Sequence, residues 1–155
     1  MADSVALYQI KRIFHAPLDF AYSWCTDYTE ADPRLQGEKG SRQIIRRTSA
    51  GAIYEDLTTT PRGWIWSRYT VTFRPPNRWH ATANGNYRTW SLDYSLRGLP
   101  DGRTEFSLRG KRRATPLGGK NPPKAVLEKE LREMWNNLGK ALEKDYRASR
   151  PQKSG

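Results

Sequence analysis

The sequence predicts a single α+β domain over residues 1–149, with an antiparallel sheet of about seven strands, two short helices after the first strand and one long C-terminal helix. Three observations support this prediction. Successive segments alternate between apolar and polar residues and are separated by turn residues. The last third of the chain instead carries apolar residues at helical spacing. A length of 155 residues suits one domain, and residues 150–155 are expected to form a flexible polar tail.

The chain is expected to begin with a strand and two short helices. The strand is predicted over Ala6–Phe14, where every second residue shares a face. Pro17 then suits the first turn of a helix over Leu18–Cys25, which Asp27 ends. The pattern Thr29–Asp32 resembles a capping box and predicts a second short helix.

Six further strands are predicted between residues 41 and 113. Short turns such as Pro100-Asp101-Gly102 separate them, so neighbouring strands should pair antiparallel. Such a meander turns one face toward the core and the other toward water. The predicted strands are Arg42–Thr48, Ala52–Thr60, Gly63–Arg74, Trp79–Ala83, Tyr87–Leu96 and Arg103–Arg113.

A long helix is predicted from about Pro122 to Ser149, with Asn121 as its N-cap. Gly139 lies in the middle of this helix, where glycine costs about 1 kcal/mol relative to alanine. We therefore expect the helix to approach the sheet closely at that point. The apolar stripe consists of Leu127, Leu131, Met134, Trp135, Leu138, Leu142 and Tyr146.

The first strand and helix also carry a family pattern, Ile10-x-Arg12-x-Phe14-x-Ala16-Pro17-Leu18-Asp19-Phe20-Ala21-Tyr22, followed by Asp27. With the order of elements, this pattern resembles the SRPBCC superfamily of START-like, birch-pollen-allergen-like and polyketide cyclase/dehydrase-like proteins. The resemblance implies the helix-grip fold, in which a curved sheet wraps round the C-terminal helix and leaves an apolar pocket between them. Members bind lipids, sterols, hormones or polyketides, some catalyse cyclisation or hydrolysis, and others bind proteins.

Residues in the inward phase of the strands and on the helix stripe are the candidates for the pocket lining. Apolar and aromatic walls with a few polar groups suit a small ligand, although the same residues could simply fill a core. Six Trp and eight Tyr favour a cavity, because these side chains need polar partners when buried. The candidate ligand-binding residues are Tyr8, Arg12, Phe14, Tyr69, Trp90, Tyr94, Phe106, Leu131, Met134, Trp135 and Leu138.

Arg12 is the one charge expected inside the domain, because it alternates in phase with Tyr8 and Phe14. An unpaired buried guanidinium is very costly. Arg12 should therefore pair with a carboxylate, reach solvent at the mouth of the pocket, or meet an anionic ligand.

The chain is strongly basic, with a net charge of +11. Residues 36–120 hold sixteen basic and six acidic side chains, a balance of +10. Such a charge is typical of an anionic partner, although solvated strand faces explain it more simply. Trp64, Trp66 and Arg68 share the outward face of one strand and could stack nucleic-acid bases, but no RNA-binding motif accompanies them.

No residue pattern indicates catalysis. A single cysteine, Cys25, excludes an internal disulfide, and its place on the first helix indicates a small hydrophobic residue. His15 and His80 are not expected to form a catalytic pair, and no metal site or cofactor is predicted. Ser-His-Asp, P-loop and dinucleotide motifs do not occur.

These observations favour a protein that binds a hydrophobic or acidic amphipathic small molecule, such as a lipid, polyketide or isoprenoid-like compound, between sheet and helix. Two alternatives stay open: a polyketide cyclase/dehydrase-like enzyme, and a sheet-face binder of nucleic acid or an acidic protein. No apolar run approaches a membrane span and no signal peptide is evident, so a soluble cytoplasmic protein is expected.

Overall fold

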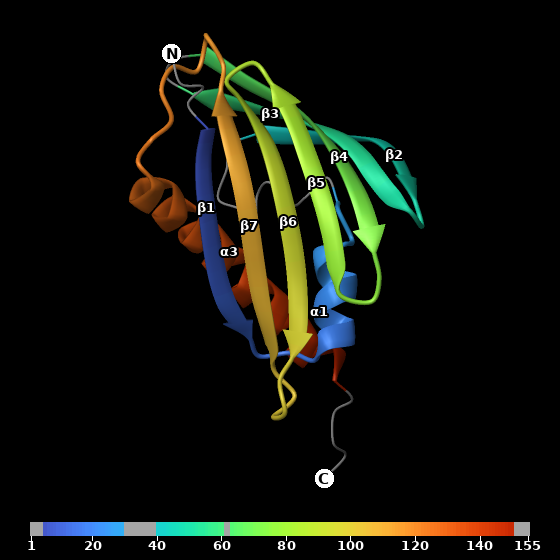
Figure 1. Ribbon diagram of the computed structural model, residues 1–155. Coiled ribbons are helices and arrows are strands. Elements are labelled where there is room, and N and C mark those ends of the chain that lie inside the picture. The colour runs from blue at the N-terminus through green and yellow to red at the C-terminus, as the bar shows by residue number, and fades with distance from the viewer. Residues whose placement is uncertain (1–4, 30–39, 61–62, 151–155) are drawn as a thin grey trace.

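The computed structural model describes residues 5–29, 40–60 and 63–150. Strand β1 and helix α1 (Leu18–Cys25) come first, six strands follow, and α3 (Lys124–Ser149) comes last (Figure 1). The strands are β1 (Val5–Phe14), β2 (Gly40–Thr48), β3 (Gly51–Thr60), β4 (Gly63–Arg74), β5 (Arg78–Gly85), β6 (Arg88–Gly98) and β7 (Thr104–Ala114). The predicted second short helix, Thr29–Asp32, extends into residues 30–39, which lie outside the described residues.

The seven strands form one antiparallel sheet in the order β1-β7-β6-β5-β4-β3-β2. Strands that follow one another from β2 to β7 are neighbours, and β1 closes the order by pairing with β7. The sheet is curved and α3 crosses its concave side, as Figure 1 shows. The predicted α+β class and helix-grip arrangement are therefore confirmed.

The core lies between the sheet and the buried stripe of α3. Phe106 on β7 packs against Trp135 with a ring-centroid distance of 4.2 Å, and Phe14 on β1 lies 5.3 Å from Phe106. Leu138 and Leu142 continue this buried stripe along α3. The helical periodicity of the sequence thus marks the face of α3 that covers the sheet. No helix of the described residues is long and apolar enough to cross a membrane.

The start of α3 differs from the sequence prediction. The helix begins at Lys124, Pro123 occupies the N-cap position, and no side chain caps the first turn. Asn121 was the expected cap, which is wrong, because its Nδ2 donates instead to the carbonyl oxygen of Arg112 at 3.2 Å. This hydrogen bond attaches the loop before α3 to the end of β7.

The close approach predicted at Gly139 is confirmed. A Cβ at this position would overlap the guanidinium group of Arg12, a side chain of β1 that extends across the helix. The glycine therefore makes room for a side chain of the sheet.

Gly110 on β7 meets a similar constraint, because a Cβ there would overlap the ring of Tyr8. Tyr8 is buried and packs edge-on against Trp90, so the ring has little room to move. We expect Gly110→Ala to lower the free energy of unfolding by about 1–3 kcal/mol, the usual cost of overpacking. Urea denaturation followed by circular dichroism measures this change.

Gly98→Ala is the matched control, because a Cβ at the end of β6 would meet only Leu18 at 3.8 Å. This variant should be neutral or gain up to about 1 kcal/mol through the lower entropy of its unfolded chain. Equal stability of the two variants would show that Tyr8 moves aside at no cost.

Candidate functional site

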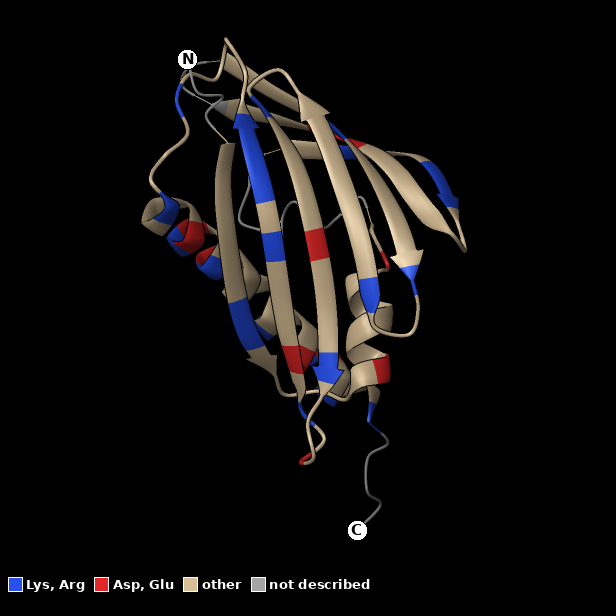
Figure 2. Ribbon diagram, viewed as in Figure 1, with Lys and Arg blue, Asp and Glu red and all other residues tan. Residues whose placement is uncertain are grey.

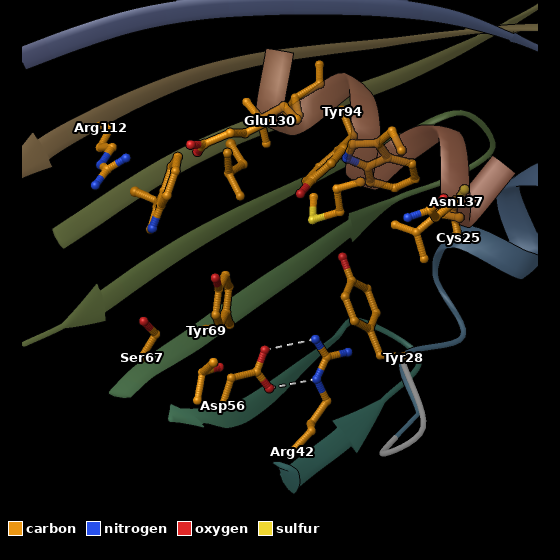
Figure 3. A pocket seen from close by; sticks show the side chains of 18 of the residues that line it. Cys25, Tyr28, Arg42, Asp56, Ser67, Tyr69, Tyr94, Arg112, Glu130 and Asn137 are labelled. Carbon is orange, nitrogen blue, oxygen red and sulfur yellow. Dashed lines mark hydrogen bonds and ion pairs between the residues drawn. The ribbon is translucent and has the colours of Figure 1, made fainter. Parts of the chain in front are cut away.

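A cavity of about 530 Å³ lies between the concave face of the sheet and α3. Its walls come from β2, β3, β4, β6 and β7, from Leu127 to Leu138 of α3, and from the end of α1 with Tyr28. Figure 3 shows side chains from these elements pointing into a common space. The inner phase of the strands therefore lines a space of ligand size instead of filling it completely.

Seven of the eleven side chains predicted to bind a ligand line this cavity, and four do not. The seven are Tyr69, Trp90, Tyr94, Leu131, Met134, Trp135 and Leu138. The other four are Tyr8, Arg12, Phe14 and Phe106, and each lies in a layer behind the lining.

The aromatic residues of this second layer are covered by residues of the first. Phe14 and Phe106 are both 0% exposed and lie beneath Trp135, which faces the cavity. Tyr8 lies edge-on to Trp90 with a centroid distance of 5.6 Å. Alternation along a strand gives the correct face for all three, but it does not say which residues the helix and neighbouring rings cover.

Arg12 holds the helix to the sheet. Its Nη1 donates to the carbonyl oxygen of Trp135 at 3.4 Å, and its Nη2 lies 3.6 Å from Oε1 of Glu143. The other carboxylate oxygen of Glu143 accepts a hydrogen bond from the backbone amide of His15 at 2.8 Å. Of the three partners that the sequence left open for Arg12, the structure therefore shows a carboxylate.

The expectation that Arg12 is the only inside charge is wrong, because three further arginines line the cavity. Arg42 forms a two-pronged ion pair with Asp56, with Nε to Oδ1 at 2.7 Å and Nη2 to Oδ2 at 2.9 Å (Figure 3). Its guanidinium also lies 4.1 Å from the ring centroid of Tyr54. This pair places a neutralised polar group in the aromatic wall.

Arg88 and Arg112 lie over one aromatic ring. Their guanidinium carbons are 4.9 Å and 5.1 Å from the centroid of Trp90. Burial, followed by the charge of Arg88, lowers the pKa of Arg112 to about 10. Alternation could have revealed both residues, because Arg112 follows Gly110 by two positions and Arg88 precedes Trp90 by two.

Burial also determines the state of the phenols in the wall. It raises the pKa values of Tyr54 and Tyr94 well above the usual tyrosine range. Both side chains are therefore neutral hydroxyl groups near neutral pH, able to donate or accept hydrogen bonds.

Neither histidine lines the cavity. His80 lies in the outward phase of β5, where its Nδ1 is 2.6 Å from Oδ1 of Asp93. His15 is exposed just after β1. Cys25 is buried and borders the cavity as a small side chain.

Trp64 and Trp66 face outward on β4 as predicted, with exposures of 58% and 37%. Arg68 beside them donates from Nε and Nη2 to Oε1 of Glu55 at 3.0 Å and 2.7 Å. Figure 2 shows basic residues on several strands of the sheet, with acidic residues among them. The charge at the centre of the predicted nucleic-acid surface is thus already paired.

Solved structures share this fold at low sequence identity. The di-domain ARO/CYC StfQ from the steffimycin biosynthetic pathway matches 88% of this chain with a TM-score of 0.67 and 18% identity. The match covers 44% of StfQ, so the chain spans less than half of that protein. A START superfamily protein from Mycobacterium smegmatis matches 92% of this chain and 97% of its own, with a TM-score of 0.67 and 17% identity. The Zhui aromatase/cyclase from a Streptomyces species matches 97% and 99%, with a TM-score of 0.70 and 11% identity.

These similarities confirm the helix-grip fold that the resemblance of the first strand and helix implied. No protein-family sequence model and no curated protein matches the chain.

The raised pKa values of Tyr54 and Tyr94 predict a loss of stability at alkaline pH. Unfolded tyrosines ionise near pH 10, whereas these folded ones stay protonated, so the stability present below about pH 10 is lost above it. The loss should approach about 1.4 kcal/mol per pH unit for each phenol.

Urea denaturation at several pH values between about 9 and 11 measures the effect. A Tyr54→Phe/Tyr94→Phe variant should lose about 2–3 kcal/mol less than the original chain at the upper end of this range. The same loss in both proteins would contradict the assignment of these phenols as neutral groups.

Proposed function

We propose that the chain binds a hydrophobic or amphipathic small molecule, such as a lipid, polyketide or isoprenoid-like compound, in the cavity between the sheet and α3. The observation that carries this proposal is the volume of the cavity, about 530 Å³. Small-molecule sites typically measure about 300–1,000 Å³.

The lining favours a ligand with a flat or flexible apolar body. Tyr54 and Tyr69 are stacked at 4.8 Å in one wall, and Trp90 and Trp135 present further aromatic surface. Met134 adds an unbranched side chain that adapts its shape to a ligand. Polar groups such as Ser67 and the Arg42–Asp56 pair would orient the ligand.

The comparisons support binding in general and leave the ligand open. A START superfamily protein and two proteins described as ARO/CYC or aromatase/cyclase share the fold. A ring-forming enzyme needs a group that transfers protons near neutral pH. The buried phenols are held protonated, neither histidine reaches the cavity, and Asp56 is paired with Arg42. Glu130 and Glu133 also border the cavity, as exposed carboxylates on α3. We infer that ligand binding is the main function and keep cyclase activity as the alternative.

A larger side chain on the cavity wall should displace the ligand. Leu131 is half-buried on α3 and borders the cavity, so Leu131→Trp would project into it. We expect the affinity for the neutral fluorescent probe N-phenyl-naphthylamine to fall about tenfold, which corresponds to roughly 1.4 kcal/mol of binding free energy. Fluorescence titration measures this affinity, and thermal denaturation monitors the fold.

Val126→Trp is the control, because Val126 is exposed on the same helix and does not border the cavity. It should leave probe affinity unchanged. Native mass spectrometry of the purified protein should also detect a co-purified small molecule. Equal probe binding by both tryptophan variants would show that the probe binds elsewhere and would contradict the proposal.

A further inference from the structure

Arg88 and Arg112 border the cavity, and neither takes part in an ion pair among the described residues. They lie on neighbouring strands, where Arg112 is the register partner of Trp90. Because both guanidinium carbons are close to the Trp90 centroid, they are at most about 10 Å apart. Two positive charges thus lie beside the same ring of the cavity wall.

Several hydrogen-bond donors at this part of the wall also have no acceptor among the described residues. The Nε atoms of Arg88 and Arg112 and Nε1 of Trp90 are buried, and none has a hydrogen-bond partner in the described part of the chain. Guanidinium and indole nitrogens only donate. Both guanidinium groups border the cavity, so an acceptor-rich group bound there would offset part of the cost of burying these donors.

The acidic side chains of the wall do not supply that group. Asp56 is bound to Arg42, as Figure 3 shows. Glu130 on α3 is exposed and acts on Arg112 only as a nearby charge. Glu133 is also exposed on α3. Neither half-buried guanidinium group therefore has an ion-pair partner among the described acidic side chains of the wall.

We propose that the ligand of this cavity is an amphipathic carboxylic acid whose carboxylate is bound by Arg88 and Arg112; this inference rests on the proposed binding function. A carboxylate has two coplanar oxygens that match the fork of a guanidinium group. The indole of Trp90 holds the two guanidinium groups by cation–π contacts. The aromatic part of the cavity then receives the apolar body of the acid.

Displacement of N-phenyl-naphthylamine by dodecanoate and by dodecanol tests the inference, because these competitors share a chain and differ in head group. The original chain should bind dodecanoate at least about tenfold more tightly, since hydrogen bonds to charged groups are among the stronger ones. Arg112→Gln and Arg88→Gln should each remove most of this preference, because they weaken dodecanoate binding much more than dodecanol binding.

Arg109→Gln is the matched control, because Arg109 is exposed in the outward phase of β7, the strand that carries Arg112. It removes the same formal charge and should keep the preference for dodecanoate. Glu130→Gln should strengthen dodecanoate binding about twofold to fivefold, because it removes a nearby negative charge. Circular dichroism verifies the fold of each variant.

Equal binding of dodecanoate and dodecanol by the original chain would overturn the carboxylate assignment while the binding function stands. An Arg109→Gln effect as large as that of Arg112→Gln would overturn it too, because net charge alone would then explain the preference. Failure of the neutral probe and of dodecanol to bind would overturn the proposed function, and this inference with it. If Arg112→Gln does not fold, two measurements still test the inference. They are the preference of the original chain for dodecanoate over dodecanol and the dodecanoate affinity of Glu130→Gln.

Discussion

The attachment of α3 to the edge strand β1 sets the position of the cavity. The backbone amide of Gln9 donates to Glu128 at 2.8 Å near the start of the helix, and that of His15 donates to Glu143 near its end. Arg12 binds the helix between these points, against Gly139. These contacts cover the free edge of β1 and hold α3 on that side of the sheet. The concave surface of β3 and β4 is consequently left to line a cavity.

Strand register decides which inward arginine finds a partner within the protein. Arg42 is the register partner of Asp56, so the sheet itself neutralises it. Arg12 gains its carboxylate from α3 instead. Arg112 faces Trp90 across the strands, and Arg88 faces Ala114, so neither meets an acid. The strand register and the position of α3 together fix where these four arginines lie. The positive charge of Arg88 and Arg112 at the end of the cavity therefore follows from the same packing that forms the core.

The sequence was sufficient for the sheet, for both described helices and for the inward face of β1, β4, β5, β6 and β7, because period-two alternation and helical spacing match the folded elements. It did not predict which inward residues are covered by α3 and which ones face the cavity. Phe14 and Phe106 lie under Trp135, and that layering depends on where α3 crosses the sheet. Arg112 was not among the predicted lining residues because it stands in the basic run Lys111-Arg112-Arg113, although strict alternation turns this middle residue inward. The prediction of Asn121 as the N-cap of α3 is wrong because its side chain donates to a backbone carbonyl of β7 instead.

That basic run changes what the net charge of +11 implies. Lys111 and Arg113 are exposed on the outer face of β7, where solvent stabilises their charges, whereas Arg112 faces a cavity of about 530 Å³. A polyanion could meet the outer residues, but a space of this size excludes a polymer. Desolvation is also what makes an inner charge selective, because electrostatic contacts strengthen as water is removed. The small acid that we propose as ligand is therefore argued from the inner charge, and the larger outer charge carries no information about it.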